Sequence, residues 1–125
     1  MSNRDETHRL ICTHRITVTE ETRTGTEVAP ALLEEIAPAS MVISCLWSAK
    51  IGADLTLDCG TCKFRGKVSH CLSWADGYLV ELQLHYDSLW APCYFMPEGI
   101  FNPKCLVCRE PGCVPNCVKP RCIGN

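Results

Sequence analysis

The sequence lacks the features that would commit it to a membrane or to nucleic acid. No apolar run approaches the length of a membrane span. The first ten residues, MSNRDETHRL, contain no apolar core of the length that a secretory signal needs. The formal net charge is only −2, and lysines and arginines are scattered rather than gathered in a stripe. From these absences we expect a cytoplasmic protein with no membrane partner and no nucleic-acid partner.

Signatures of catalysis are also missing. The chain contains no glycine-rich phosphate loop and no nucleophile elbow. His14, His70 and His85 are isolated on strand-like segments, where an ordinary surface or core histidine is the simpler interpretation. Cys71 beside His70 cannot form a catalytic dyad, because neighbours in a strand point to opposite faces. We therefore predict that the protein is not an enzyme, and a cysteine-nucleophile enzyme is the least favoured hypothesis.

The abundant residue is cysteine. An odd number of cysteines without an export signal argues against a disulfide framework, so we expect reduced thiols, some of them available to a metal. Two of them, Cys45 and Cys71, sit within strand-like runs, where a thiol usually behaves as a small buried apolar group. The eleven cysteines are at positions 12, 45, 59, 62, 71, 93, 105, 108, 113, 117 and 122.

Residues 53–68 predict a β-hairpin whose register can be written out. The runs ADLTLDC and CKFRGKV both alternate apolar and polar residues, and Gly60-Thr61 separates them. Closing the turn there puts the apolar residues on one face and the charges on the other, whereas a slip of one residue would mix the faces. The predicted pairs are Cys59–Cys62, Leu57–Phe64, Leu55–Gly66 and Ala53–Val68 on the apolar face, and Asp58–Lys63, Thr56–Arg65 and Asp54–Lys67 on the polar face.

Further strands flank this hairpin. The chain continues past residue 70, is predicted to turn at Asp76-Gly77, and returns as YLVELQL. Residues 12–20 and 41–47 have the composition of strands, and 29–35 read as a strand or loop. We expect the tryptophans at 47, 74 and 90 to pack the interior. The residues predicted to share one face of the returning strand are Tyr78, Val80, Leu82 and Leu84.

About six strands with short connections and hardly any helix predict an all-β fold. The economical architecture is a small six-stranded antiparallel barrel, because closure hides the strand edges. From residue 103 the chain becomes irregular, with five cysteines and four prolines. We therefore divide the chain into a flexible N-terminal arm (1–11), a barrel domain (12–102) and a Cys-rich tail (103–125).

The order of these features resembles the PilZ domain, a six-stranded bacterial barrel whose better-known members bind cyclic di-GMP. The resemblance lies in IAPASMVIS, GADLTL, FRGKVSHC and DGYLVELQL. These segments look like the strand after the family's Asp-x-Ser-x-x-Gly motif, its large-Gly-x-x-hydrophobic turn, its Gly-x-Val strand and its closing strand. WAPCYFMPEGIFNPKCL is similar to the segment that follows the barrel in some such proteins. The resemblance spans residues 12–104 and implies a regulatory binding module.

The nucleotide-binding residues of that family match poorly. The family holds its ligand with an Arg-x-x-x-Arg arm, whose guanidiniums fork onto phosphate or stack on guanine, and with the Asp-x-Ser-x-x-Gly strand. Arg15 stands where the second arginine of the arm would be, but Ile11 occupies the first position. In the strand motif, Glu35 replaces Asp, Ala37 replaces Ser and Ser40 replaces Gly. Arg15 is therefore the single candidate nucleotide-binding residue, and cyclic di-GMP is a doubtful ligand.

The tail is a candidate metal site. A C-x-x-C pair suits two thiolates on one zinc, because a tight turn aims both sulfurs inward. A disordered, reduced tail is the alternative, and the spacing matches neither common ferredoxin pattern. A second C-x-x-C pair, Cys59–Cys62, would imitate a zinc ribbon if it bound a metal together with the Cys105–Cys108 pair of the tail. A thioredoxin-like redox role is not expected for Cys59–Cys62, because such a role needs a helix after the pair and no helix is predicted there. The candidate zinc ligands of the tail are Cys105, Cys108, Cys113, Cys117 and Cys122.

Two functional hypotheses follow. The first is a non-enzymatic, PilZ-like binding or regulatory module that acts on a protein partner, with cyclic di-GMP as an additional, doubtful ligand. The alternative is a small zinc-binding protein that uses its C-terminal cysteines.

Overall fold

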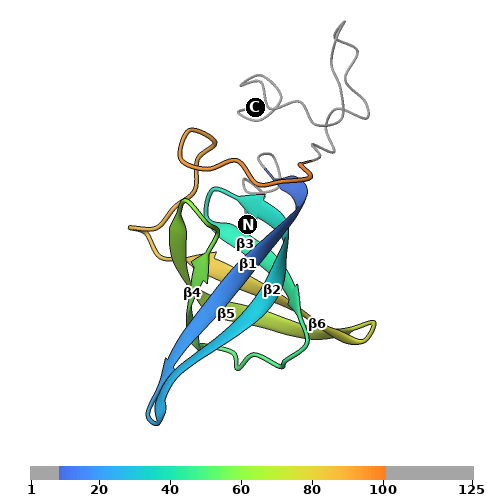
Figure 1. Cartoon of the computed structure of the whole chain (residues 1–125), viewed down its shortest axis with the longest axis vertical. Coiled ribbons are helices and arrows are strands. Elements are labelled where there is room, and N and C mark those ends of the chain that lie inside the picture. The colour runs from blue at the N-terminus through green and yellow to red at the C-terminus, as the bar shows by residue number, and fades with distance from the viewer. Residues whose placement is uncertain (1–8, 101–125) are drawn as a thin grey trace, which may run out of the picture.

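The computed structural model describes residues 9–100, and these form a closed antiparallel barrel without helices (Figure 1). The barrel order is β1-β2-β3-β6-β5-β4. The prediction of an all-β, six-stranded barrel is confirmed. No helix among the described residues is long and apolar enough to cross a membrane. The strands are β1 (Leu10–Thr22), β2 (Gly25–Ala37), β3 (Ser40–Cys45), β4 (Asp54–Asp58), β5 (Lys63–Trp74) and β6 (Gly77–Leu84).

The β4–β5 hairpin has the predicted register. Leu57 lies opposite Phe64, Leu55 opposite Gly66, and the three polar pairs are also formed as predicted. The backbone N–H of Cys59 donates to the carbonyl of Cys62 at 2.8 Å, which closes the turn. The alternation of apolar and polar residues therefore determined this part of the fold, because only one register buries all the apolar side chains.

The core fills the barrel interior with alternate residues of every strand. The inward positions of β6 are Val80, Leu82 and Leu84, as predicted, and Tyr78 packs partly buried against them. Cys45 is buried and Cys71 is partly buried against the core, so both thiols act as small apolar groups. The largest side chains with almost no exposure are Leu10, Leu33, Ile36, Met41, Ile43, Leu55, Leu57 and Leu82.

The β5–β6 hairpin differs from the prediction at its turn. Trp74 pairs with Gly77, so the turn residues are Ala75 and Asp76 rather than Asp76-Gly77, and Ala75 adopts a positive φ of 51°. Gly77 has another reason to be glycine: a Cβ there would lie 2.3 Å from the carbonyl oxygen of Cys45. The close approach of β3, and not the turn itself, requires glycine at this position.

A bulge in β5 reverses which residues face inward. The pairing with β6 shifts between Val68 and His70. Phe64 and Val68 are buried before the shift, whereas Leu72 and Trp74 are exposed after it. The prediction that all three tryptophans pack the interior is therefore wrong for Trp74. It holds for Trp90, which is buried, and for Trp47, which packs partly buried against the core.

Strands β1 and β2 are longer than their sequence segments suggested, and their hairpin extends beyond the barrel (Figure 1, blue and cyan). The turn is formed by Arg23 and Thr24, and Thr22 Oγ1 donates to the carbonyl of Gly25 at 2.7 Å. The part of β2 before Leu32 pairs only with β1, because β3 begins its pairing at Leu32. We call residues 16–31 the β1–β2 arm. The base of the arm belongs to the barrel, because residues 17–19 pair with β4 and Ile16 and Val18 are buried, and its outer part forms the extension.

The segment after β6 runs across one end of the barrel (Figure 1, orange). Trp90 is buried there. Its backbone N–H donates a hydrogen bond to the carbonyl of Pro38, and its indole Nε1 donates to the carbonyl of Phe95 at 2.7 Å. Thr13 donates its backbone N–H to the carbonyl of Glu98, which ties the end of this segment to β1. The segment therefore covers the core at this end of the barrel, and it is hydrogen-bonded both to the β2–β3 turn at Pro38 and to β1 at Thr13.

Candidate docking site

A groove of about 590 Å³ opens between the β1–β2 arm and the β5–β6 hairpin. One wall is formed by β1 and β2 where β2 parts from β3. The other wall is formed by the residues that follow β3 and by the turn of the β5–β6 hairpin. The lining residues, which we call the aromatic groove, are Arg15, Ile16, Pro30, Ala31, Leu32, Glu34, residues 44–47 and residues 74–78.

Three aromatic side chains line this groove, and one of them is largely in solvent. Trp74 is 60% exposed and Leu46 is 82% exposed, while Trp47 and Tyr78 are half-buried. The Cys45 thiol contacts the carbonyl oxygen of Trp47 at 3.2 Å, which fixes the chain just after β3. Exposed single apolar residues are ordinary, but several aromatic residues gathered in a concave site are typical of an interaction site.

The charges of the groove are mixed. Arg15 is exposed on β1 and forms no ion pair within residues 9–100. Glu34 accepts a hydrogen bond from the Ser44 hydroxyl at 2.7 Å, and Asp76 lies at the hairpin turn. One guanidinium therefore faces two carboxylates, so the groove has no excess of positive charge.

Arg15 also borders a second, more polar hollow of about 1130 Å³ near residues 58–61 and 92–98. His14 lies in it and holds three segments together: the backbone N–H of Glu98 donates to Nδ1 at 3.0 Å, and Nε2 contacts the carbonyl oxygen of Cys59 at 2.9 Å. These contacts require the proton on Nε2. The ring of His14 also packs edge-on against Phe95, so this histidine has a structural role.

The remaining positions of the nucleotide motif are not available to a ligand at this groove. Glu35 forms an ion pair with Arg9. Ala37 and Ser40 are buried, with 1% and 3% of their surface exposed. Of the residues suggested by the PilZ resemblance, the structure therefore places only Arg15 on the groove.

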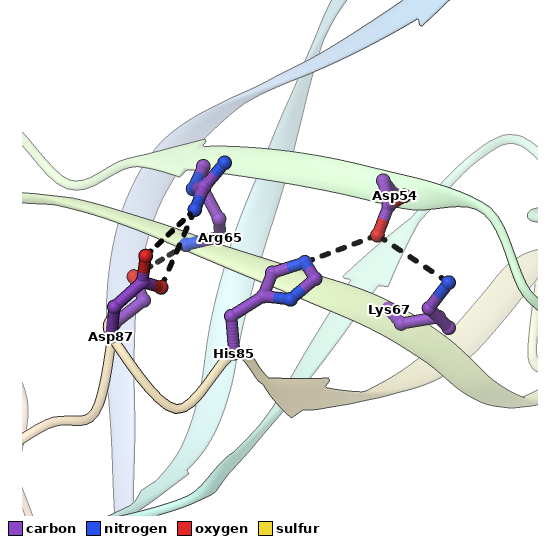
Figure 2. Close-up of polar contacts among 6 residues, drawn as sticks. Asp54, Arg65, Lys67, His85 and Asp87 are labelled. Carbon is purple, nitrogen blue, oxygen red and sulfur yellow. Dashed lines mark hydrogen bonds and ion pairs between the residues drawn. The ribbon is translucent and has the colours of Figure 1, made fainter.

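A separate polar cluster joins β4 and β5 to the segment after β6 (Figure 2). His85 Nε2 lies 3.1 Å from Asp54 Oδ1, and Lys67 Nζ lies 3.9 Å from the same oxygen. The guanidinium of Arg65 pairs with Asp87 at 3.1 Å. All five side chains are substantially exposed, and such surface pairs contribute little to stability. The cluster shows where the segment after β6 lies against β4 and β5.

Three of the described cysteines, Cys12, Cys45 and Cys59, are buried, whereas Cys62 and Cys71 are half-buried and Cys93 is exposed. Burial raises the pKa of Cys12 and of Cys59 to about 12, and burial also raises the pKa of Cys45. Cys62 is half-buried, and its thiol contacts the carbonyl oxygen of Tyr94 at 3.3 Å. Within residues 9–100 there is no group of three or more side chains placed to hold a metal ion. The predicted ligands Cys105, Cys108, Cys113, Cys117 and Cys122 lie outside the described residues.

Comparison with models of protein families, with curated proteins and with solved structures gives no match for this chain. The site must therefore be interpreted from its own geometry.

Sequence reasoning missed the aromatic groove because it placed Trp74 inside the barrel. A signal was present in the alternation of β5. In FRGKV the apolar residues occupy even positions, and Leu72 and Trp74 return to that phase. Only the pair His70-Cys71, with a polar residue at the even position and the thiol at the odd one, departs from it. A break of this kind is what a bulge produces.

Proposed function

We propose that this chain is a non-enzymatic, PilZ-like cytoplasmic module that docks a segment of a partner protein in the aromatic groove. The observation that carries the proposal is the exposed indole of Trp74 in a concave site with Trp47, Tyr78 and Leu46. The few residues that dominate binding energy at protein interfaces are enriched in tryptophan, tyrosine and arginine. The PilZ-like part of the proposal rests on the sequence resemblance, with which a six-stranded barrel is compatible.

The charges of the groove favour a protein segment over a cyclic dinucleotide. A dinucleotide carries two phosphates, which need guanidinium or ammonium partners. Among residues 9–100, Arg15 is the only cationic residue that lines the groove, and Glu34 and Asp76 would repel phosphate. A peptide with apolar side chains fits the aromatic wall, and a basic residue would satisfy the carboxylates.

Site-specific photo-crosslinking tests this function. A benzophenone amino acid replaces Trp74 in one variant and Tyr86 in the other. Tyr86 is the matched control because it is an aromatic residue that is 90% exposed and lies outside the groove. In an extract of the producing cells we expect a discrete protein adduct at position 74 and none at position 86. Equal adducts at both positions, or none at position 74, would overturn the proposal.

A further inference from the structure

The β1–β2 arm has an open strand edge. Residues 25–31 of β2 pair with β1 on one side. On the other side β3 pairs only with residues 32–37, so no strand of residues 9–100 covers the edge before Leu32. An open edge presents unpaired backbone N–H and C=O groups to another chain. This edge of β2 is therefore a place where a strand can be added.

The aromatic groove meets this edge at its barrel end, at Pro30 and Ala31. Ala31 and Leu32 are neighbours in a strand, so their side chains point to opposite faces, yet both line the groove. The same is true of Arg15 and Ile16 on β1. A groove bordered by both faces of a strand runs along its edge. A segment lying there would continue the line of β3 beside the backbone of β2.

The arm also carries unbalanced negative charge. Glu20 on β1 lies directly opposite Glu27 on β2, and like charges in such a pair destabilise a sheet. Neither carboxylate forms an ion pair among the described residues. The arm also contains Glu21 and Arg23, and Glu34 and Asp76 lie at the groove. Arg15 and Arg23 therefore do not balance the five carboxylates, and the excess of negative charge favours a cationic partner.

We propose that a basic, extended segment of the partner protein binds as an added strand on residues 25–31 of β2. Its backbone pairs with the β2 edge, an apolar side chain packs on Trp74, and a lysine or arginine lies beside Glu27. Pro30 has no N–H, so the added strand pairs there through its own donors to β2 carbonyls. This inference rests on the proposed function and specifies both the conformation and the charge of the bound segment.

Titration of the full ¹⁵N-labelled chain with a synthetic peptide of about nine alternating lysine and valine residues tests strand addition. One control peptide has the same side chains but N-methyl groups on alternate amides, and a second has glutamate in place of lysine. We expect the first peptide to shift the amide resonances of residues 25–31. We expect both controls to bind at least about 10-fold more weakly, because each loses hydrogen bonds or charge pairing. Glu27→Gln should weaken the lysine peptide several-fold and leave the fold intact, since Glu27 is exposed.

Other results would overturn strand addition. Equal binding of the N-methylated peptide, or shifts confined to the indole resonances of Trp47 and Trp74, would show that the groove binds side chains without pairing β2. No binding of the lysine peptide would have the same consequence. After any of these three results, a crosslink at position 74 would still support the proposed function. Failure of that crosslink would reject the proposed function itself.

Discussion

Leu57 on β4 lies directly opposite Phe64 on β5, and both side chains are buried, at 0% and 3% exposure. The neighbouring pair, Asp58 and Lys63, points to the outer face of the same hairpin. Inner and outer faces therefore alternate with the period of a strand, and substitutions one residue apart should have opposite consequences.

The first prediction compares adjacent residues of β5. Phe64→Asp should abolish folding, because it buries a carboxylate among apolar side chains without a partner. Lys63→Ala should lower the free energy of unfolding by less than about 1 kcal/mol, since Lys63 is exposed and forms no ion pair within residues 9–100. Urea denaturation, monitored by circular dichroism, measures the stability of both variants. Unfolding by Lys63→Ala, with a folded Phe64→Asp variant, would mean that the two faces of β5 are exchanged.

Alkaline pH should destabilise the fold through Cys12 and Cys59. Burial, together with a smaller effect of nearby carboxylates (Glu34 for Cys12, Asp58 for Cys59), raises the pKa of each thiol to about 12. The unfolded chain releases these protons near the ordinary thiol pKa of 9.0, while the folded chain keeps them. Their contribution to stability is therefore complete below that value and is lost as the pH rises toward about 12.

Urea midpoints measured between about pH 8 and pH 10.5 test this dependence. A Cys12→Ala, Cys59→Ala double variant should lose stability overall but show a shallower decline with pH. Cys93→Ala is the control, because Cys93 is exposed and should leave the profile unchanged. A profile that is equally steep in the double variant would assign the alkaline transition to other groups.

Zinc content separates the two hypotheses for the C-terminal cysteines. If they bind zinc, about one zinc per chain should co-purify, and Cys105→Ser or Cys108→Ser should remove it. Elemental analysis of the purified protein under reducing conditions makes the measurement. Absence of zinc would contradict the zinc hypothesis. Stoichiometric zinc that survives removal of residues 103–125 would instead point to Cys59 and Cys62.

Cyclic di-GMP should not bind saturably at low micromolar concentration. Each charge-assisted hydrogen bond contributes about 1.5–3 kcal/mol, and the chain retains only Arg15 from the arginine arm, while Ala37 and Ser40 are buried. Isothermal titration calorimetry gives the answer. A tight isotherm that Arg15→Ala abolishes would show that the nucleotide motif is aligned incorrectly. Weak binding that is insensitive to Arg15→Ala would indicate a nonspecific contact.

The sequence was informative where one face of a strand is buried. The β4–β5 register followed from alternation because a slip would expose Leu57 and Phe64. The turn at residues 75–76 was misplaced because Gly77 looks like a turn glycine, although its small size serves the contact with Cys45. That contact joins strands distant in sequence, so local patterns carry no trace of it.

The candidate site was less predictable than the fold. Arg15 was named as a nucleotide-binding candidate from the resemblance to the PilZ arginine arm; it lines the groove, and its role in binding a nucleotide stays a prediction. Trp74 was not identified as a site residue, because the bulge after Val68 changes the phase of β5 and turns this side chain outward. The groove itself arises where β2 and β3 part, which depends on how far β3 extends and not on any motif.

Affinity for the protein captured at position 74 is the most direct measure of docking in the aromatic groove. Trp74→Ala should weaken binding of that protein by about 2 kcal/mol, roughly 30-fold, because a central tryptophan carries much of an interface's energy. Tyr86→Ala should change it less than about 2-fold, since Tyr86 lies outside the groove. Both variants should remain folded, because both side chains are mostly exposed. Equal affinities of the wild type and Trp74→Ala would contradict docking in the groove.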